Sequence, residues 1–297
     1  MLRYAPLSAE NYIRNRKAFA DALAPGALAL FSSNDTYPSG ADGTLPFRQD
    51  SNMLHMCGVD QEETVLLVFP NAHNPADREI LFVTETSAEI AIWEGAKLTK
   101  AEATAQTGVK QVQWLSTLER TIQRLVTECS CCYLHQNEHT RANVVVETRE
   151  ARFNKWFTET YPHVRIERSA PLLHRLRSVK SEEEIERMRH ACNITRDGFN
   201  RVMKFVKPGV TEFEVEAEYL HEFIRKGSRG FAYTPIVASG ASACVLHYIE
   251  NSAECKAGDV LLMDVGAEYG NYASDMTRCL PVSGRFTDRQ RKVYDAV

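Results

Sequence analysis

The 297-residue sequence lacks several features that would place it in particular classes of protein. No apolar run approaches the roughly 20 residues that a membrane-spanning helix needs, and the charged N-terminal segment MLRYAPLSAENYIRNRKAF is unlike a signal peptide. Basic residues do not outnumber acidic ones, since the formal net charge is -4 with both signs mixed along the chain. Repeats and low-complexity tracts are also absent. We therefore expect a soluble, cytoplasmic protein with no nucleic-acid or membrane partner.

A disulfide framework is missing as well. The eight cysteines are scattered between positions 57 and 279, which in a chain of this length indicates reduced thiols. The cluster CSCC at 129–132, with His135 and His139 nearby, contains residue types that bind zinc. However, CCYLH is typical of a strand, in which Cys131 and Cys132 point to opposite faces. The cluster therefore does not favour zinc.

Length and composition indicate two domains, because 44% hydrophobic residues support substantial cores and 297 residues exceed the usual size of one. In the first part, runs typical of strands alternate with segments typical of helices. We expect strands at ALALFS, ETVLLVF, EILFV, CCYLH and HVRIE, and helices over 8–23, 100–106, 116–127 and 144–160. This alternation predicts an α/β domain over residues 1–172, with the boundary near Pro171.

The second part, residues 173–297, opens with two helix-start signals. Ser181 and Glu184 form a capping-box pattern ahead of helical spacing, which the Pro-Gly at 208–209 stops. Thr211 with Glu214 starts a second helix, and Gly227 ends it. Strands follow these helices, so the pattern predicts helices that cover an antiparallel sheet.

Asp264 and Asp275 are the most informative pair of residues in the chain. They lie eleven positions apart in LLMDVGAEYGNYASDMTRCL, whose flanks predict two strands joined by a turn at EYGN. A hairpin centred between Tyr269 and Gly270 places Asp264 directly opposite Asp275. We therefore expect both carboxylates on one face of the hairpin, with Cβ atoms roughly 5 Å apart.

Two carboxylates that close repel each other, and a divalent cation relieves both the repulsion and the cost of desolvation. Oxygen ligands favour manganese, magnesium or a similar hard ion. The alternative is a solvated turn whose acids only line the rim, and the spacing alone does not decide between the two. His247, in ASGASACVLHYIEN, favours the metal site, because an imidazole can move a proton or bind substrate in a metal-activated reaction.

Several long segments resemble one family. FAYTPIVASGASACVLHYIEN and AGDVLLMDVGAEYGNYASDMTRCLPVSGRFTDRQRKVYDAV resemble the pita-bread metallopeptidases, and among them the aminopeptidase P family. PFRQDSNMLHMCGVDQEETVLLVFP resembles the N-terminal domain of that family, and HRLRSVKSEEEIERMRHACNITRDGF resembles the helix that opens its catalytic domain. The resemblance covers essentially the whole chain. It implies an α/β N-terminal domain followed by an α+β pita-bread catalytic domain over 173–297.

The resemblance also implies roles for individual residues. Asp264 matches a ligand of one metal ion, and Asp275 matches a carboxylate that bridges two ions. His247 matches a histidine near the substrate, where it acts in catalysis and binding, and Thr277 matches a partner of the ligands. Tyr233 matches a substrate-side aromatic of the SYN-like segment of the family, although the following Thr-Pro departs from that segment.

The activity implied by the resemblance is hydrolysis of the bond that precedes a proline in second position. The cofactors would be two divalent ions, with manganese as the first choice, and the substrate a peptide with an Xaa-Pro N-terminus. A homodimer or homotetramer is implied as well. EIAIWEG around Trp93 aligns with a loop that reaches a neighbouring subunit's active site in some relatives, although an ordinary surface or core aromatic is an equal explanation.

Two alternatives share the fold. Prolidase has the same metals but cleaves only Xaa-Pro dipeptides. A metal-free pita-bread protein would act as a creatinase-like hydrolase or as a binding module. Retention of both Asp264 and Asp275 argues against this second alternative.

The chain departs from the family in one large respect. The remaining metal ligands of the family are a histidine and two glutamates well downstream of the aspartate pair, whereas only 22 residues follow Asp275 and none is histidine. Such ions prefer about four to six ligands each, and two carboxylates do not supply that number. We therefore expect a truncated, proteolysed or partial polypeptide that lacks the C-terminal part of the catalytic domain, binds metal weakly and is inactive by itself.

Overall fold

The computed structural model describes residues 3–4, 6–139 and 145–297. Contacts divide the chain into two compact units, one formed by Pro6–Lys180 and the other by Met1–Ala5 with Ser181–Val297. The division thus follows residue 180, whereas the sequence predicts it after 172. The intervening residues belong to the first unit because α7 (Ala170–Ser178) buries Leu173 in its core, and Pro171 occupies the first turn of this helix, where its missing N–H is not needed.

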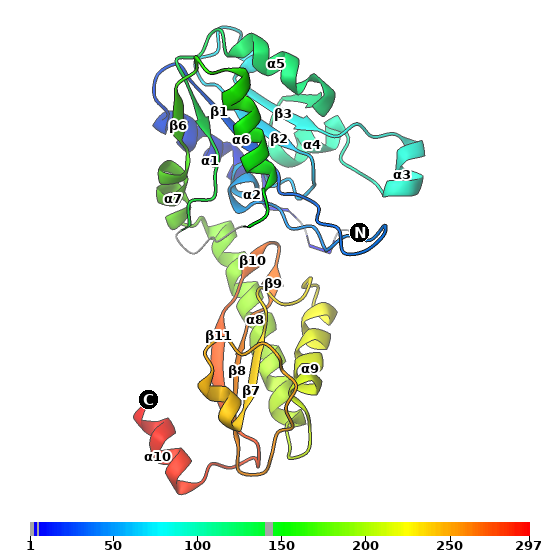
Figure 1. Ribbon diagram of the computed structural model, residues 1–297, viewed down its shortest axis with the longest axis vertical. Coiled ribbons are helices and arrows are strands. Elements are labelled where there is room, and N and C mark those ends of the chain that lie inside the picture. The colour runs from blue at the N-terminus through cyan, green and yellow to red at the C-terminus, as the bar shows by residue number, and fades with distance from the viewer. Residues whose placement is uncertain (1–2, 5, 140–144) are drawn as a thin grey trace. The chain divides into compact units, whose positions relative to one another are not determined.

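The first unit is built on a six-stranded mixed sheet of order β4-β3-β2-β1-β5-β6, with helices on both faces (Figure 1). β1, β5 and β6 are parallel, β2 runs antiparallel to β1 and β3, and β4 is parallel to β3. The elements are α1 (Ala9–Ala22), β1 (Ala27–Ser32), α2 (Ser51–Cys57), β2 (Val65–Val68), η1 (Pro75–Asp77), β3 (Glu79–Val83), α3 (Ala88–Glu94), α4 (Lys100–Thr107), β4 (Gln111–Trp114), η2 (Leu115–Thr117), α5 (Leu118–Leu125), β5 (Cys131–Leu134), α6 (Arg149–Thr160), β6 (Ile166–Arg168) and α7.

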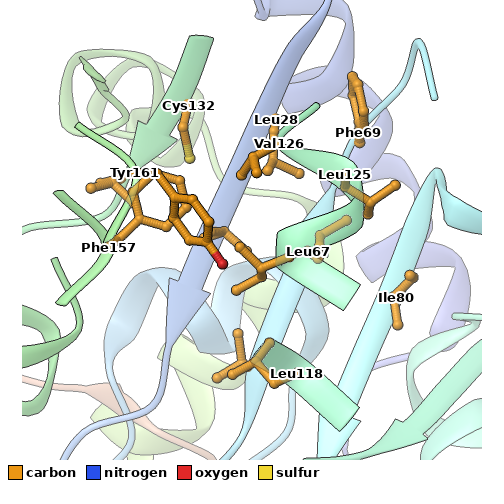
Figure 2. Packing of buried hydrophobic residues seen from close by; sticks show 14 of the residues in the cluster. Leu28, Leu67, Phe69, Ile80, Leu118, Leu125, Val126, Cys132, Phe157 and Tyr161 are labelled. Atoms are coloured by element: carbon orange, nitrogen blue, oxygen red, sulfur yellow. The ribbon is translucent and has the colours of Figure 1, made fainter. Parts of the chain in front are cut away.

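Burial on both faces explains why the central strands read as continuous apolar runs. Alternate residues of β1, β2 and β3 enter separate cores, since Leu28 and Leu67 pack with α5 and α6, whereas Phe31 and Leu66 pack with α1, α2 and α4. Figure 2 shows the first of these cores, in which Leu28 and Leu67 lie with Leu118, Leu125, Phe157 and Tyr161. The α/β class predicted for this part of the chain is therefore confirmed.

Most strands of this unit lie where the sequence predicts them, whereas the short helices α2, α3 and α7 and the strand β4 were missed. β1 and β3 have the predicted bounds, and α6 begins at Arg149 rather than at 144, a position outside the described residues. α2 was missed because seven residues are too few to show periodicity, although Asp50 caps its N-terminus and Gly58 ends it with a positive φ. β4 was also missed, because its four residues, QVQW, alternate polar and apolar side chains over too short a run to indicate a strand.

The second unit contains two long helices and a three-stranded antiparallel sheet of order β11-β8-β7. Figure 1 shows α8 and α9 along one face of these strands. Both predicted capping boxes are present, since Ser181 N–H donates to Glu184 and Thr211 N–H donates to Glu214. The elements are α8 (Glu182–Phe205), α9 (Glu212–Arg225), β7 (Ile236–Ser239), η3 (Gly240–Cys244), β8 (Val260–Val265), β9 (Glu268–Tyr269), β10 (Tyr272–Ala273), β11 (Met276–Pro281) and α10 (Asp288–Ala296).

The two faces of this sheet differ. Leu261, Met263 and Val265 of β8 point to the helices and are fully buried, as is Val237 of β7. The alternate residues of β8, including Asp264, point to the opposite face and are only partly buried. The period-two pattern of β8 thus places a carboxylate on the face without helices. Among the described residues, no helix is long and apolar enough to cross a membrane.

Candidate metal centre

The hairpin that carries the two aspartates has a different register from the predicted one. Asp264 of β8 pairs with Thr277 of β11, not with Asp275. The turn residues Gly270 and Asn271 both have positive φ, which is the requirement of a two-residue type I′ turn and places the hairpin centre between them. Asp275 is therefore diagonal to Asp264. The two residues still share a face of the hairpin, because the register differs from the predicted one by two positions. Diagonal neighbours of this kind have Cβ atoms typically about 7–8 Å apart.

The hydroxyl group of Tyr233 brings the two carboxylates to one point. Its Oη lies 2.6 Å from Oδ1 of Asp264 and 3.0 Å from Oδ1 of Asp275, so the tyrosine donates its single proton between two acceptors. Burial raises the pKa of Tyr233 well above its ordinary value, and the two carboxylate acceptors raise it further. The phenol thus stays protonated. The sequence predicted Tyr233 near the substrate, and the structure places it against both predicted ligands.

Buried hydroxyl groups fix the backbone just before Asp275. Ser274 and Thr195 of α8 are buried, their oxygens lie 2.6 Å apart, and both accept from the N–H of Ala267. Gly266 permits this close approach, because a Cβ there would lie 1.8 Å from the carbonyl oxygen of Ser274. Any larger residue at 266 would displace the strand that positions Asp275.

The charge around the two aspartates is negative and is not balanced by a nearby cation of the described chain. No Lys, Arg or His of the described chain makes an ion pair with Asp264 or Asp275, and Asp275 is exposed to solvent. Two carboxylates around one hydroxyl create a negative potential that favours a divalent cation. Within the described residues, however, no group of three or more His, Cys, Asp or Glu side chains is arranged to hold a metal ion. The structure therefore gathers two candidate ligands, and further donors are needed for a complete coordination shell.

His247 lies apart from this pair. It is exposed in the loop that joins β7 to β8, and its side chain makes no hydrogen bond within the described part of the chain. The neighbouring Val245, Leu246 and Ile249 are exposed as well, and Leu246 is 90% accessible. The structure therefore gives no direct contact between His247 and the aspartates. Thr277 is exposed on the same face as Asp264, directly opposite it.

Sequence reasoning did not anticipate the contacts of Tyr233 or the buried pair of Thr195 and Ser274. Tyr233 is 31 residues from Asp264 and 42 from Asp275, and no local pattern predicts such a contact. Thr195 falls in the same helical spacing as Phe199 and Val202, which is the one signal for its burial that the sequence offers. A polar residue on that face needs a partner, and Ser274 provides it.

Comparison with known proteins identifies the family. Residues 12–134 match the model of the aminopeptidase P N-terminal domain, and residues 186–297 match that of metallopeptidase family M24. Zn-substituted Escherichia coli aminopeptidase P in complex with product has a TM-score of 0.85 at 33% identity, covering 99% of this chain and 67% of that one. The chain belongs to the aminopeptidase P family.

Other members of the family agree with this assignment. The Xaa-Pro aminopeptidase of Escherichia coli K12 is 34% identical over 98% of this chain, and human Xaa-Pro aminopeptidase 3 is 31% identical over 89%. The structure of aminopeptidase PepP from Pseudomonas aeruginosa has a TM-score of 0.89 at 28% identity, covering 99% of this chain and 66% of its own. The chain spans 66% of the length of the E. coli protein and 52% of the human one. The predicted two-part architecture, with a pita-bread second domain, is thus confirmed.

Proposed function

We propose that the protein is a metal-dependent aminopeptidase that releases the N-terminal residue from peptides with proline in second position. The observation that carries the proposal is the convergence of Asp264 and Asp275 on one point, with no cation of the described chain to neutralise them. The names of the relatives, which are Xaa-Pro aminopeptidases, supply the reaction.

The donor chemistry of the aspartate pair fits a hard divalent ion. Carboxylate oxygens suit manganese, magnesium and related ions, and the E. coli relative has been obtained in a zinc-substituted form. We propose two ions, with manganese as the physiological metal, held in part by Asp264 and Asp275. When bound, such ions lower the pKa of water and polarise the peptide carbonyl. The Tyr233 hydroxyl orients both carboxylates through its hydrogen bonds.

The other predicted residues act on the substrate in this proposal. His247 approaches the peptide from the loop between β7 and β8, where it donates a hydrogen bond to the substrate or moves a proton. The ring of Tyr233 lies at the same face and forms part of the wall around the scissile bond. The bond before proline carries no N–H, so an enzyme for it needs a pocket that does not use that hydrogen bond.

Oligomer formation is part of the proposal. Figure 1 shows α3 at the end of a loop that extends from the sheet of the first unit, and Ile92 and Trp93 on this helix are 76% and 89% exposed. Two exposed apolar side chains on a helix that projects from its domain are typical of a surface that contacts another subunit. The alternative is that Trp93 is an ordinary exposed aromatic residue with no partner subunit. We propose a homodimer or homotetramer in the cytoplasm, in keeping with eight free cysteines.

The test uses the protein as its gene encodes it, loaded with Mn²⁺. Xaa-Pro-Xaa tripeptides and Xaa-Pro dipeptides are compared by chromatography of the released amino acid, with and without a chelator. Asp264→Asn is the inactivating variant, and Asp288→Asn, which removes an exposed carboxylate from α10 in the same unit, is its matched control. Tripeptide hydrolysis that needs Asp264 and metal supports the proposal. Cleavage of dipeptides alone identifies a prolidase, and the lack of both metal binding and hydrolysis identifies a metal-free member of the fold.

A further inference from the structure

We infer that Glu212 and Tyr248 are positioning residues for His247, and this inference rests on the proposed function. His247 lies in a 20-residue connection between β7 and β8, from Gly240 to Asp259, in which only η3 is regular. Loops of this length without secondary structure are commonly mobile unless specific contacts fix them. An exposed histidine on such a loop has no defined direction unless its neighbours are held.

Glu212 is the centre of the contacts that hold this loop. Its side chain is fully buried, and its oxygens accept from the N–H of Ser239 at 2.7 Å, the Tyr248 hydroxyl at 2.7 Å and the N–H of Ala253 at 2.9 Å. Among the described residues, no Lys, Arg or His pairs with Glu212. A buried carboxylate without a counter-charge is costly unless donors surround it, and its place in the first turn of α9 adds a favourable helix dipole.

The three donors lie immediately before this loop, next to His247 within it, and farther along it. Ser239 ends β7, Tyr248 is the residue after His247, and Ala253 precedes the return to β8. Glu212 therefore ties the loop to α9 on both sides of the histidine. The contact with Tyr248 is the closest to His247 along the chain. It fixes the adjacent backbone and so limits the directions that the imidazole can take.

Asn251 completes the anchoring. It is 3% exposed with a φ of 46°, its Oδ1 accepts from the N–H of Val237, and its Nδ2 donates to the carbonyl of Pro235 and to Glu216. Asparagine is one of the few residues that adopts this left-handed conformation readily. The segment from Tyr248 to Ala253 is thus attached to β7 and α9, whereas within the described structure Val245 to His247 make no hydrogen bond to either element. A rigid base with an exposed tip is the arrangement expected for a residue that meets a substrate.

The first test is amide hydrogen exchange in Tyr248→Phe, because this variant removes one hydroxyl group and leaves the ring. We expect exchange in residues 245–253 to rise roughly tenfold, the equivalent of one net hydrogen bond, with α8 unchanged. The matched control is Tyr272→Phe, which also removes a tyrosine-to-carboxylate hydrogen bond in this unit, from Tyr272 to Glu184 at 3.0 Å. The control should leave the exchange of residues 245–253 unchanged. Unaltered exchange in Tyr248→Phe overturns the inference whether or not the protein is a peptidase.

The second test asks whether the contact acts through the histidine. In the active protein, Tyr248→Phe should lower kcat/KM roughly tenfold, whereas in a His247→Ala background the same change should have less than a twofold effect, about the limit of additivity. Equal losses in both backgrounds would indicate a merely structural role and overturn the assignment. If the wild type hydrolyses no Xaa-Pro peptide, the proposed function fails instead, and the exchange experiment still decides whether Glu212 and Tyr248 order the loop.

Discussion

The pair Asp50 and Glu150 and the pair Asp264 and Asp275 each meet around a single side chain, and they differ in what lies between the charges. In the first unit, Asp50 and Glu150 flank His135, whose Nε2 lies 3.2 Å from Asp50 and 3.4 Å from Glu150. In the second unit, Asp264 and Asp275 share only the neutral hydroxyl of Tyr233. The first pair contains its own cation when His135 is protonated. The second leaves its negative charge to be met from outside the described chain.

The protonation of the buried cluster follows from its contacts. Burial by itself would lower the pKa of His135, but the contact with Asp50 and the charge of Glu150 raise it above its ordinary value. Burial likewise opposes ionisation of Asp50, but His135 and the N–H groups of Met53 and Asn52 lower its pKa overall. Burial raises the pKa of Glu150. A carboxylate pair that is neutralised by a histidine between its members stabilises the fold. A pair without such a cation is a candidate set of metal ligands.

The largest effect should come from breaking the buried pair. Asp50→Ala removes both the N-cap of α2 and the partner of a histidine that is 2% exposed, so we expect a loss of about 3 kcal/mol in the free energy of unfolding. Urea unfolding followed by tryptophan fluorescence measures this loss in the first unit alone, because all three tryptophans lie there.

Asp275→Ala is the contrasting variant for the effect on stability. Asp275 is exposed and has no cationic partner in the described chain, so its removal from the metal-free protein should change stability by less than about 0.5 kcal/mol. Because the second unit has no tryptophan, thermal unfolding by circular dichroism is the measurement. A loss as large as that of Asp50→Ala would show that the two pairs are both structural, and the contrast would fail.

The two carboxylate pairs should affect metal affinity in the opposite order, with the larger loss at the pair of Asp264 and Asp275. Asp264→Asn removes a proposed ligand, and we expect Mn²⁺ binding measured by calorimetry to weaken at least about 100-fold, the upper end of the loss seen when only an outer partner is removed. Asp50→Asn keeps a capping side chain and is the control, for which affinity should stay within twofold. Equal Mn²⁺ affinity in wild type and Asp264→Asn would remove the metal from the proposal.

Tyr233→Phe should have a smaller effect on the same measurement. The ring stays in place and both carboxylates remain, but the hydroxyl that orients them is lost, so Mn²⁺ affinity should fall about 10-fold. Tyr272→Phe, at the tip of the hairpin, is the control and should leave Mn²⁺ affinity unchanged. If Tyr233→Phe instead tightened binding, its hydroxyl would be a competitor for the carboxylates rather than their support.

The sequence predicted those parts of the site that depend on the alternation of side chains along a strand. It did not predict those that depend on tertiary contacts. Asp264 and Asp275 share a face in either register, because an error of two positions preserves the alternation of a strand. The error arose because the predicted turn was centred one residue early, between Tyr269 and Gly270 rather than between Gly270 and Asn271. The contacts of Tyr233 and the anchoring of the His247 loop connect residues distant in sequence, so no local pattern encodes them.

The smallest expected effect is the pH dependence of the buried cluster. Because the folded pKa of His135 is raised above 6.5, its stabilising contribution is complete below pH 6.5 and is lost as the pH rises through the folded pKa. Burial and, less strongly, the charge of Arg177, which reaches Asn52 from α7, oppose this shift in the pKa, whereas Asp50 and Glu150 produce it. Urea unfolding at several pH values above 6.5 should show declining stability in the wild type and a flatter profile in His135→Gln. A wild-type profile as flat as that of His135→Gln would mean that the histidine is neutral between its two acids, and the distinction between the two carboxylate pairs would then rest on burial alone.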